Sequence, residues 1–392
     1  MRKEGTCEEL LCLAPKAPEW KIDWGRIGDS RMSPMIARMK ETRQNPAWHG
    51  EGDVWTHTRM VCEALAADAG FQSLSRRLQE ELFLAALLHD VGKIPTTRLE
   101  DGQWVSPGHT AVGARMAREF LWLEYGFCGK AEWQAFRETV CSLIRYHSVP
   151  PHILGQKHPE RRLIQIASNG RLSADFSIKL LCLLVKADMQ GRIFDDIEGS
   201  LETVELCEVQ AEELGCLKEP FPFPTAASQY AYLEGRSILP GQEWYDDTWG
   251  EVVVMAGLPG TGKDTWIREH CSSLPMISLD ELRRQMDVQP TAEQGPVVTA
   301  ARQLAKAYLR DKIPFVWNAT NLTPVIRGKL VKLFTDYHAS VKMIYLETEW
   351  EEQLRRNRER SKAVPEQVIR RMLGYMTLPE CFEAHRVEWH CV

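Results

Sequence analysis

The chain has 392 residues, which is too long for one hydrophobic core and predicts two domains. With 44% hydrophobic and 26% charged residues, its composition is that of an ordinary soluble protein. The net charge of -6 argues against a surface that coats nucleic acid nonspecifically, although it leaves room for a local basic groove.

Other features of the composition bear on the compartment. There is no charged-then-apolar leader and no apolar run of about 18 residues, so we expect neither secretion nor a membrane span. The eleven cysteines are scattered and include no Cys-x-x-Cys pair, which favours reduced, mostly buried thiols. Together these features predict a cytoplasmic protein.

The first half of the chain predicts an all-α domain. After an irregular lead-in over residues 1–46, apolar residues recur every three and four positions from Trp55 to Phe194, and no strand is expected there. A further helix is expected to end near Leu214, where Gly215 is a stop signal. We place this domain at residues 1–230, with its core at about 47–195 and a turn-rich linker to about 247.

The second half, residues 248–392, alternates between strand and helix patterns. Strands are expected at 251–256, 276–279, 313–318 and 341–347, and the helices between them include 295–311 and 324–337. Strands that alternate with helices favour a parallel sheet covered on both faces. The fold class is therefore an all-α domain followed by an α/β domain with a parallel sheet.

Six histidine and aspartate side chains in the helical half form a candidate metal site: His57, His89, Asp90, His109, His147 and Asp188. His57, His147 and Asp188 have apolar residues at helical spacing, which puts each on the inward stripe of its helix. Any one alone is more often a satisfied core residue. Several buried His and Asp residues on one core need a shared partner, and a divalent metal is the usual one.

His89-Asp90 ends an apolar helix and continues as Val-Gly-Lys93, a pattern that resembles the HD-domain metal phosphohydrolases over about residues 47–195. The resemblance implies that four residues ligate one metal: His57, His89, Asp90 and Asp188. Some members of the family hold a second metal with two further histidines, and His109 and His147 fit that role. It also implies that Lys93 contacts a substrate phosphate. The segment around His49 resembles the opening of bacterial members, and His49 is expected either to face substrate or to be structural.

The expected reaction of this domain is hydrolysis of a phosphoester. A metal held by His and Asp lowers the pKa of bound water and neutralises phosphate charge, and Lys93 adds positive charge as the transition state forms. Histidine ligands suit transition metals such as Mn²⁺, Co²⁺ or Ni²⁺ better than Mg²⁺.

The strand expected at 251–256 leads into a glycine-rich loop with the pattern of a P-loop, Gly257-Leu-Pro-Gly-Thr-Gly-Lys263-Asp-Thr265. Its backbone N–H groups and Lys263 are expected to hold the phosphates of ATP or another nucleoside triphosphate with Mg²⁺. The predicted binding residues are Gly257, Gly260, Thr261, Gly262, Lys263, Asp264 and Thr265. Asp264 replaces the usual Ser or Thr near Mg²⁺, so either its carboxylate or the Thr265 hydroxyl serves there. A plain glycine-rich turn is the alternative, and it leaves Lys263 unexplained.

Asp280 follows the next expected strand and can accept a proton from an attacking hydroxyl, while Arg283 can hold an acceptor phosphate. The alternative is an Asp that caps a helix beside a surface Arg.

Arg356 and Arg360 lie in an arginine-rich helix before Pro365 and could form a lid over the transferred phosphate. A solvated helix with Glu/Arg pairs is the alternative there.

Over about residues 250–380 these motifs resemble the phage-type 5′-polynucleotide kinases. The resemblance implies that Lys263 and the lid residues Arg356 and Arg360 act on the γ-phosphate, that Asp280 is the general base, and that Arg283 is an acceptor 3′-phosphate clamp. The Asn318-Ala-Thr-Asn-Leu segment departs from the family, because Ala319 replaces an Asp. Asp264 could restore the lost carboxylate near Mg²⁺.

An HD phosphohydrolase fused ahead of a kinase resembles the bacterial HD–polynucleotide kinase class of RNA end-healing enzymes. That resemblance implies removal of a 2′,3′-cyclic phosphate or 2′-phosphate, phosphorylation of 5′-OH ends of RNA or DNA, and cooperation with an RNA ligase. Two alternatives stay open. One is a nucleotidase fused to a small-molecule or nucleotide kinase, and the other is a non-catalytic nucleotide sensor.

Overall fold

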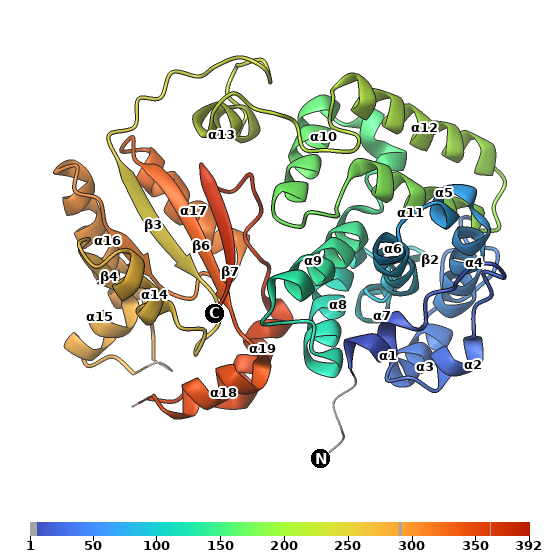
Figure 1. The fold of residues 1–392 in the computed structure, drawn as a ribbon, viewed down its shortest axis with the longest axis horizontal. Coiled ribbons are helices and arrows are strands. Elements are labelled where there is room, and N and C mark those ends of the chain that lie inside the picture. The colour runs from blue at the N-terminus through green and yellow to red at the C-terminus, as the bar shows by residue number, and fades with distance from the viewer. Residues whose placement is uncertain (1–5, 290–291, 361) are drawn as a thin grey trace. The chain divides into compact units, whose positions relative to one another are not determined.

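A computed structural model of the protein describes residues 6–289, 292–360 and 362–392. The chain divides into two compact units (Figure 1). The first comprises the residues up to Phe127 together with Glu132–Phe221, and the second comprises Cys128–Ala131 together with Pro222–Val392. None of the helices described is both long and apolar enough to cross a membrane.

The first unit is helical, which confirms the predicted class. Its α-helices are α1 Cys7–Leu11, α2 Trp24–Gly28, α3 Ser33–Glu41, α4 Val54–Ala67, α5 Ala69–Gln72, α6 Arg76–Leu88, α7 Lys93–Thr96, α8 His109–Tyr125, α9 Ala131–Tyr146, α10 Pro159–Ala167, α11 Ile178–Gln190 and α12 Ile197–Glu213. Two short 3-10 helices, Pro150–Gly155 and Ser168–Arg171, complete it. The lead-in expected to be irregular instead carries α1 to α3.

Helices α4, α6 and α11 pack against one another at the centre of this unit. The stretch Leu82–Leu88 of α6 is completely buried, and α11 buries residues on all its sides, as expected for helices surrounded by others. Side chains fix where these helices begin. Asp53 accepts hydrogen bonds of 2.9 Å from the N–H groups of Trp55 and Thr56 at the start of α4, and Ser177 caps α11.

One hairpin interrupts the helices, and the prediction of no strand before residue 194 is wrong at this point. Strands β1 Arg98–Glu100 and β2 Gln103–Val105 pair in antiparallel fashion. The turn residues Asp101 and Gly102 have φ values of 48° and 79°. An Asp-Gly pair tolerates this left-handed backbone, which is the usual signal for a two-residue hairpin turn.

Helix α6 carries a buried carboxyl group, that of Glu81. Neither side-chain oxygen of Glu81 accepts a hydrogen bond from the described residues, and Arg77 Nε lies 3.3 Å from Oε1. Burial, reinforced by the charge of Asp175, raises the pKa of Glu81 well above 4.5. The folded state therefore retains a proton that the unfolded chain releases above about pH 4.5, and its stability falls as the pH rises from there towards the raised pKa.

Because glutamine mimics the protonated carboxyl, we expect Glu81→Gln to be more stable than the wild type near pH 7.5, with a difference that shrinks towards pH 4.5. Urea unfolding midpoints at the two pH values measure this effect. Glu212→Gln, which changes an exposed carboxylate, should show no such pH-dependent difference. An equal or lower midpoint for Glu81→Gln at pH 7.5 would contradict the assignment.

The second unit is an α/β domain, also as predicted. Its elements are α13 Ala226–Glu234, β3 Glu251–Ala256, α14 Lys263–His270, β4 Met276–Ser278, α15 Leu279–Gln285, α16 Gly295–Arg310, β5 Val316–Asn318, α17 Pro324–Thr335, β6 Ser340–Glu347, α18 Trp350–Arg358, α19 Glu366–Tyr375 and β7 Arg386–Cys391. The five strands are ordered β4-β5-β3-β6-β7, and every neighbouring pair is parallel. The edge strand β7 was not predicted.

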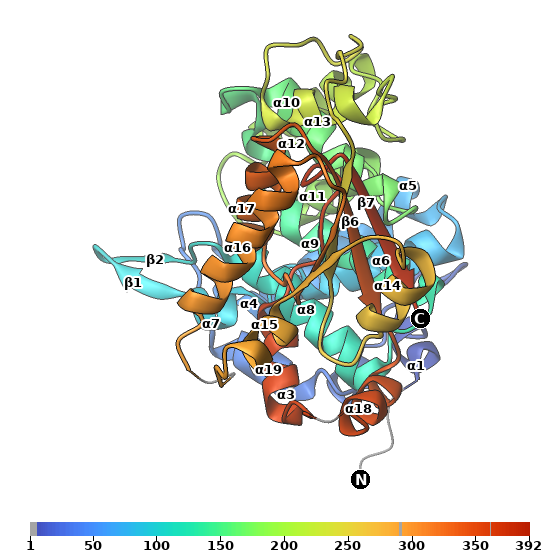
Figure 2. The same cartoon turned by 90° about the vertical axis from the view of Figure 1, so that its left-hand side faces the viewer.

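Both faces of this sheet are covered by helices. Val252 and Val254 of β3 belong to the core formed with α16 and α17, the two helices labelled on the viewer's side of Figure 2. The alternate residues Val253 and Met255 pack in a second core with Trp266 of α14. A strand buried on both faces reads as a continuous apolar run, which is why β3 was recognisable.

The segment expected to be a linker up to residue 247 contains a helix. Tyr230 of α13 packs in the core of the α/β unit, with its ring stacked on His385 at a centroid distance of 4.1 Å. The α/β unit accordingly takes in the chain from Pro222 onward, earlier than the expected start at residue 248.

Candidate active sites

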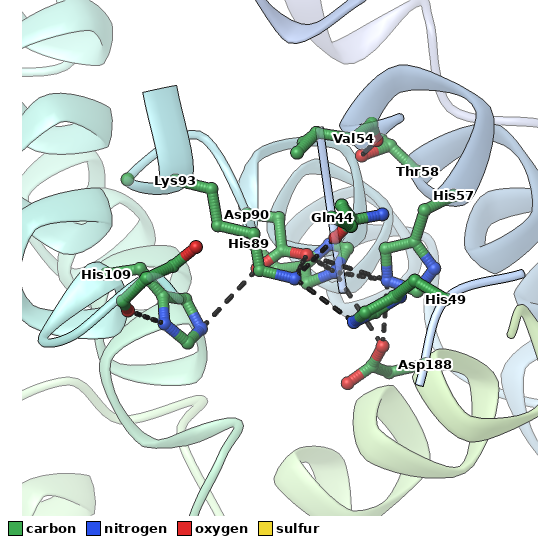
Figure 3. A network of polar contacts seen from close by, with 12 residues as sticks. Gln44, His49, Val54, His57, Thr58, His89, Asp90, Lys93, His109 and Asp188 are labelled. Carbon is green, nitrogen blue, oxygen red and sulfur yellow. Dashed lines mark hydrogen bonds and ion pairs between the residues drawn. The ribbon is translucent and has the colours of Figure 1, made fainter. Parts of the chain in front are cut away.

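The six predicted metal ligands converge within the helical unit, and Figure 3 labels all of them except His147. Five of them are buried, and His109 is partly exposed. The ends of five helices supply them: His57 near the start of α4, His89 and Asp90 after α6, His109 at the start of α8, His147 after α9, and Asp188 near the end of α11. Helix ends therefore bring together ligands that are far apart in the sequence.

Asp90 lies at the centre of this cluster. Its Oδ2 lies 3.3 Å from His89 Nε2 and 3.6 Å from His57 Nε2. Its Oδ1 faces the other two histidines, 3.5 Å from His109 Nε2 and 3.9 Å from His147 Nε2. Each carboxylate oxygen thus faces a different pair of imidazoles, which is the arrangement expected if Asp90 is shared by two adjacent metal positions.

The protonation of the four imidazoles also suits metal binding. Each Nδ1 donates to a backbone carbonyl, at distances of 3.1 Å for His57 to Gly191, 2.8 Å for His89 to Ala86, 2.9 Å for His109 to Ser106 and 2.7 Å for His147 to Ile144. A carbonyl oxygen only accepts, so Nδ1 carries the proton and the lone pair of the neutral ring lies on Nε2. All four Nε2 atoms point towards the carboxylates, as metal ligands oriented by backbone contacts do.

The carboxylates supply a further test of fit. Neither oxygen of Asp90 accepts a hydrogen bond from the described residues, although Lys93 Nζ lies 2.7 Å from Oδ2. Asp188 Oδ1 lies 3.0 Å from His57 Nε2. Lys93 pairs with Oδ2 of Asp90, whereas Oδ1 faces the imidazoles of His109 and His147. A buried carboxylate oxygen without a hydrogen bond is costly unless a cation completes it. The donor set of imidazole nitrogen and carboxylate oxygen therefore fits one or two divalent metal ions.

Gly92 allows the close packing that brings His109 to this centre. A Cβ at position 92 would lie 2.0 Å from the carbonyl oxygen of His109 and 2.5 Å from the N of Gly113. Only glycine fits where the turn after Asp90 touches the first turns of α8. The close contact between this turn and α8 therefore explains why the His-Asp-x-Gly-Lys pattern has a glycine at this position.

Lys93 and His49 face the same pocket. Lys93 Nζ donates to Gln44 Oε1 at 2.6 Å and lies 3.4 Å from His49 Nε2 (Figure 3). His49 Nδ1 lies 2.8 Å from Glu51 Oε1. Of the two readings of His49, the geometry favours the one in which it faces the pocket.

Two site residues were missed by sequence reasoning. Glu51 has a buried side chain and links His49 to His57, whose Nδ1 lies 3.0 Å from Glu51 Oε1. Arg192 pairs with Asp188 Oδ2 at 2.5 Å. Arg192 lies four residues after Asp188, just beyond the end of α11, and this spacing was a usable signal, whereas nothing in the local pattern distinguishes Glu51.

The electrostatics favour the metal-binding form of most of these groups. His57 is the exception, because its burial is outweighed by hydrogen bonds to Asp188 and Glu51, which raise its pKa. Burial opposes ionisation of Asp90, but Lys93 and His89 outweigh it and hold the pKa of Asp90 well below its usual range. Burial lowers the pKa of His147 to about 3 and that of His49 to about 4, so both rings are neutral near pH 7. Ionised carboxylates and neutral imidazoles are the forms that bind metal.

In the α/β unit the loop after β3 has the backbone that phosphate binding requires. Gly257, Gly260 and Gly262 have φ values of 137°, 86° and 84°, which favour glycine. Lys263 Nζ donates to the carbonyls of Gly257 and Leu258 at 2.9 and 2.8 Å, so it folds back over the loop. Burial lowers the pKa of Lys263 to about 8.

Asp264 lies beside the end of β5. Its Oδ1 accepts a hydrogen bond of 2.6 Å from Asn318 Nδ2, immediately before Ala319. Thr265 is exposed, and its hydroxyl accepts from Arg268 at 3.1 Å. Thr261 is buried and donates to Leu258 O within the loop. Asp264 and Thr265 were the two candidates for the Mg²⁺ position. Of these, Asp264 contacts the residue before Ala319, the position at which the resembling kinases have an Asp.

Asp280 does not cap a helix, which removes one alternative considered above. Ser278 is the cap of α15, because its hydroxyl accepts from the N–H of Glu281 at 3.3 Å. The exposed carboxylate of Asp280 instead forms ion pairs with Arg283 and, at 3.4 Å, with Arg360. One carboxylate thus contacts both the proposed acceptor clamp and a proposed lid residue.

Helix α18 packs against the glycine-rich loop. Gln353 donates to Pro259 O at 3.0 Å, and a Cβ at Gly262 would lie 3.3 Å from Arg356 Nη1. Arg356 also pairs with Glu352 at 2.6 Å, one helical turn earlier. Arg356 therefore lies at the phosphate loop, as a lid residue would, and it also forms a Glu/Arg pair, as on a solvated helix. The geometry agrees in part with each of the two interpretations of this helix.

Comparison with known proteins agrees with the division of the chain into a helical unit and an α/β unit. Residues 54–169 match the HD domain family, and residues 252–379 match an AAA domain family. A stretch of 90 residues is 40% identical to the Multifunctional CCA protein of Halorhodospira halophila and spans 23% of this chain and 19% of that relative. The chain joins an HD domain, which implies divalent-metal binding, to a P-loop kinase-like domain, and this pairing supports a nucleotide-related bifunctional enzyme.

Proposed function

We propose that this protein heals broken RNA ends. The HD unit removes a 2′,3′-cyclic phosphate or 2′-phosphate, and the P-loop unit transfers the γ-phosphate of ATP or another nucleoside triphosphate to a 5′-hydroxyl. The observation that carries the proposal is the Asp280 carboxylate with its contacts to Arg283 and Arg360. A base, an acceptor-phosphate clamp and a lid arginine in contact are suited to a polynucleotide acceptor.

In the HD unit the residues of the chain bind and orient the phosphoester. Metal held by the six ligands would supply an activated water and neutralise phosphate charge. Lys93 Nζ, at 2.7 Å from Asp90, is positioned to pair with a non-bridging phosphate oxygen. His49 points Nε2 into the pocket and can hydrogen-bond the same substrate. The burial of these groups limits bulk water and strengthens their electrostatic effect.

In the P-loop unit the roles follow from position. Lys263 exchanges its two carbonyl partners for phosphate oxygens when a nucleotide binds, and Arg356 and Arg360 stabilise the charge on the transferred group. Asp280 accepts the proton of the 5′-hydroxyl. Asp264, next to Asn318, replaces the missing carboxylate at position 319 as a partner of Mg²⁺.

The test is end-group analysis of an RNA that carries a 5′-hydroxyl and a 2′,3′-cyclic phosphate. After incubation with ATP and divalent metals, we expect a 5′-phosphate and free 2′,3′-hydroxyls. A parallel panel of nucleosides and nucleotides separates the alternatives. Phosphorylation of nucleosides or nucleotides but not of RNA would favour a nucleotide-metabolism enzyme, and binding without turnover would favour a sensor.

The two activities should differ in their metal requirement. Because imidazole ligands suit transition metals better than Mg²⁺, we expect Mn²⁺, Co²⁺ or Ni²⁺ to support phosphohydrolysis better than Mg²⁺, whereas Mg²⁺ suffices for the kinase. The measurement is the rate of each activity after metal stripping and re-addition of single ions. Full phosphohydrolase activity in Mg²⁺ alone would show that the histidines do not select the ion.

Arg283 should act on the acceptor rather than on ATP. Arg283→Ala is expected to raise KM for oligonucleotides with a 3′-phosphate by roughly 10- to 100-fold, the effect of losing one charge-assisted contact. KM for ATP should change little. An equal effect on acceptors with and without a 3′-phosphate would remove the clamp assignment.

A further inference from the structure

Two chain segments meet beside the metal centre. Residues 45–53 carry His49 and Glu51, and residues 191–194 follow the last ligand-bearing helix. Gly50 N donates to Ile193 O at 2.8 Å, and Ile193 N donates to Glu51 Oε2 at 3.0 Å. The contact is tight, because a Cβ at Gly50 would lie 2.9 Å from Ile193 O. The two segments therefore hold each other in place.

Each segment carries an exposed apolar side chain next to a polar residue of the site. Trp48 is 57% exposed and precedes the buried His49, while Ile193 is 54% exposed and follows Arg192, the partner of Asp188. The ring of Phe194 lies 6.2 Å from that of Trp48, with the planes tilted by 53°. A group of exposed apolar residues with a polar site beside it is typical of a ligand surface.

We propose that Trp48 and Phe194 form a platform on which the nucleobase of the nucleotide carrying the reacting phosphate stacks. This inference rests on the proposed phosphohydrolase function and adds a substrate subsite to it. Trp48 directly precedes His49, which contacts Lys93, and Phe194 lies two residues after Arg192, the partner of Asp188. Because the base is attached to the same ribose as the 2′ and 3′ oxygens, we expect it to extend towards this aromatic pair when the phosphate lies at Lys93 and His49.

The platform supplies affinity without reading the sequence of the RNA. Aromatic rings accept every base, because each base presents a π-face. Trp48 is 57% exposed as a residue, which leaves its side chain available to a base. We therefore expect tolerance of all four terminal bases and loss of affinity when the base is absent.

Kinetics test this subsite with two substrates. With nucleoside 2′,3′-cyclic phosphates, Trp48→Ala should raise KM roughly 5- to 150-fold, the range for one lost stacking contact, and leave kcat nearly unchanged. With the base-free glycerol 1,2-cyclic phosphate the variant should match the wild type. Trp48→Phe should recover most of the affinity. Leu206→Ala, which removes another exposed apolar side chain of the same unit, is the control and should have no effect.

Photocrosslinking locates the bound base directly and does not depend on turnover. An RNA that ends in 4-thiouridine 2′-phosphate, irradiated with the protein, should crosslink to a peptide containing Trp48 or Phe194. Phe194→Leu, which keeps the bulk and removes the ring, gives a second variant if Trp48→Ala misfolds. Crosslinks elsewhere in the helical unit, or an unchanged KM in folded Trp48→Ala and Phe194→Leu, would overturn the platform. Failure of the wild type to hydrolyse either cyclic phosphate would instead refute the proposed function, and the crosslink would still report on the platform.

Discussion

Asp90→Ala is expected to reduce removal of the 2′,3′-cyclic phosphate by more than about 100-fold and to leave 5′-phosphorylation largely unchanged. Asp90 faces both pairs of imidazoles, so its loss removes a carboxylate common to both halves of the proposed metal site. Even residues that only support metal ligands commonly contribute 10- to 100-fold, and a central ligand should contribute more. The measurement is the rate of each activity on one doubly labelled RNA.

Lys263→Ala provides the reciprocal experiment. It removes the ammonium that contacts the loop carbonyls of Gly257 and Leu258, so transfer of the γ-phosphate should be lost while phosphohydrolysis continues. Metal content and circular dichroism serve as controls for both variants. Loss of both activities in a folded Asp90→Ala protein would contradict two independent sites.

The sequence was sufficient where a local pattern carries the information. The run Glu251–Ala256 with the glycine-rich loop after it identified β3 and the P-loop, since a doubly buried strand and a phosphate loop are both contiguous. Helical spacing around His57, His147 and Asp188 correctly indicated that these polar side chains are buried. Whether they bind metal remains a prediction.

Other features depend on contacts between distant segments. Glu51 becomes part of the pocket only because α4 and the end of α11 bring His57 and Ile193 to it. The turn-rich composition around α13 concealed a helix that is stabilised by packing of Tyr230 in the sheet core. Strand β7 alternates charged and apolar residues at a sheet edge, a weaker pattern than that of β3.

The structure also changed the interpretation of Asp280. From the sequence, Asp280 could have been a helix cap, and then its charge would be dispensable. Because Ser278 caps α15, the charge of Asp280 needs another explanation. Its exposed carboxylate contacts Arg283 and Arg360, so two explanations remain: it accepts the acceptor's proton, or it orients these arginines.

Asp280→Asn distinguishes these explanations. Asparagine keeps the size and can still accept hydrogen bonds from Arg283 and Arg360, but it is not a base at neutral pH. If Asp280 takes the proton of the 5′-hydroxyl, kcat should fall by about 10²- to 10⁴-fold while ATP affinity stays within a few-fold. If it only orients the arginines, Asp280→Asn should keep most of the activity, and the main effect should appear as a higher KM for 3′-phosphorylated acceptors, as in Arg283→Ala.

Ser278→Ala is the matched control, because loss of the cap should cost about 1 kcal/mol of stability and leave the chemical step unchanged. Near-wild-type turnover by Asp280→Asn at saturating RNA and ATP would exclude Asp280 as the general base, since no interaction with the arginines compensates for a missing proton acceptor.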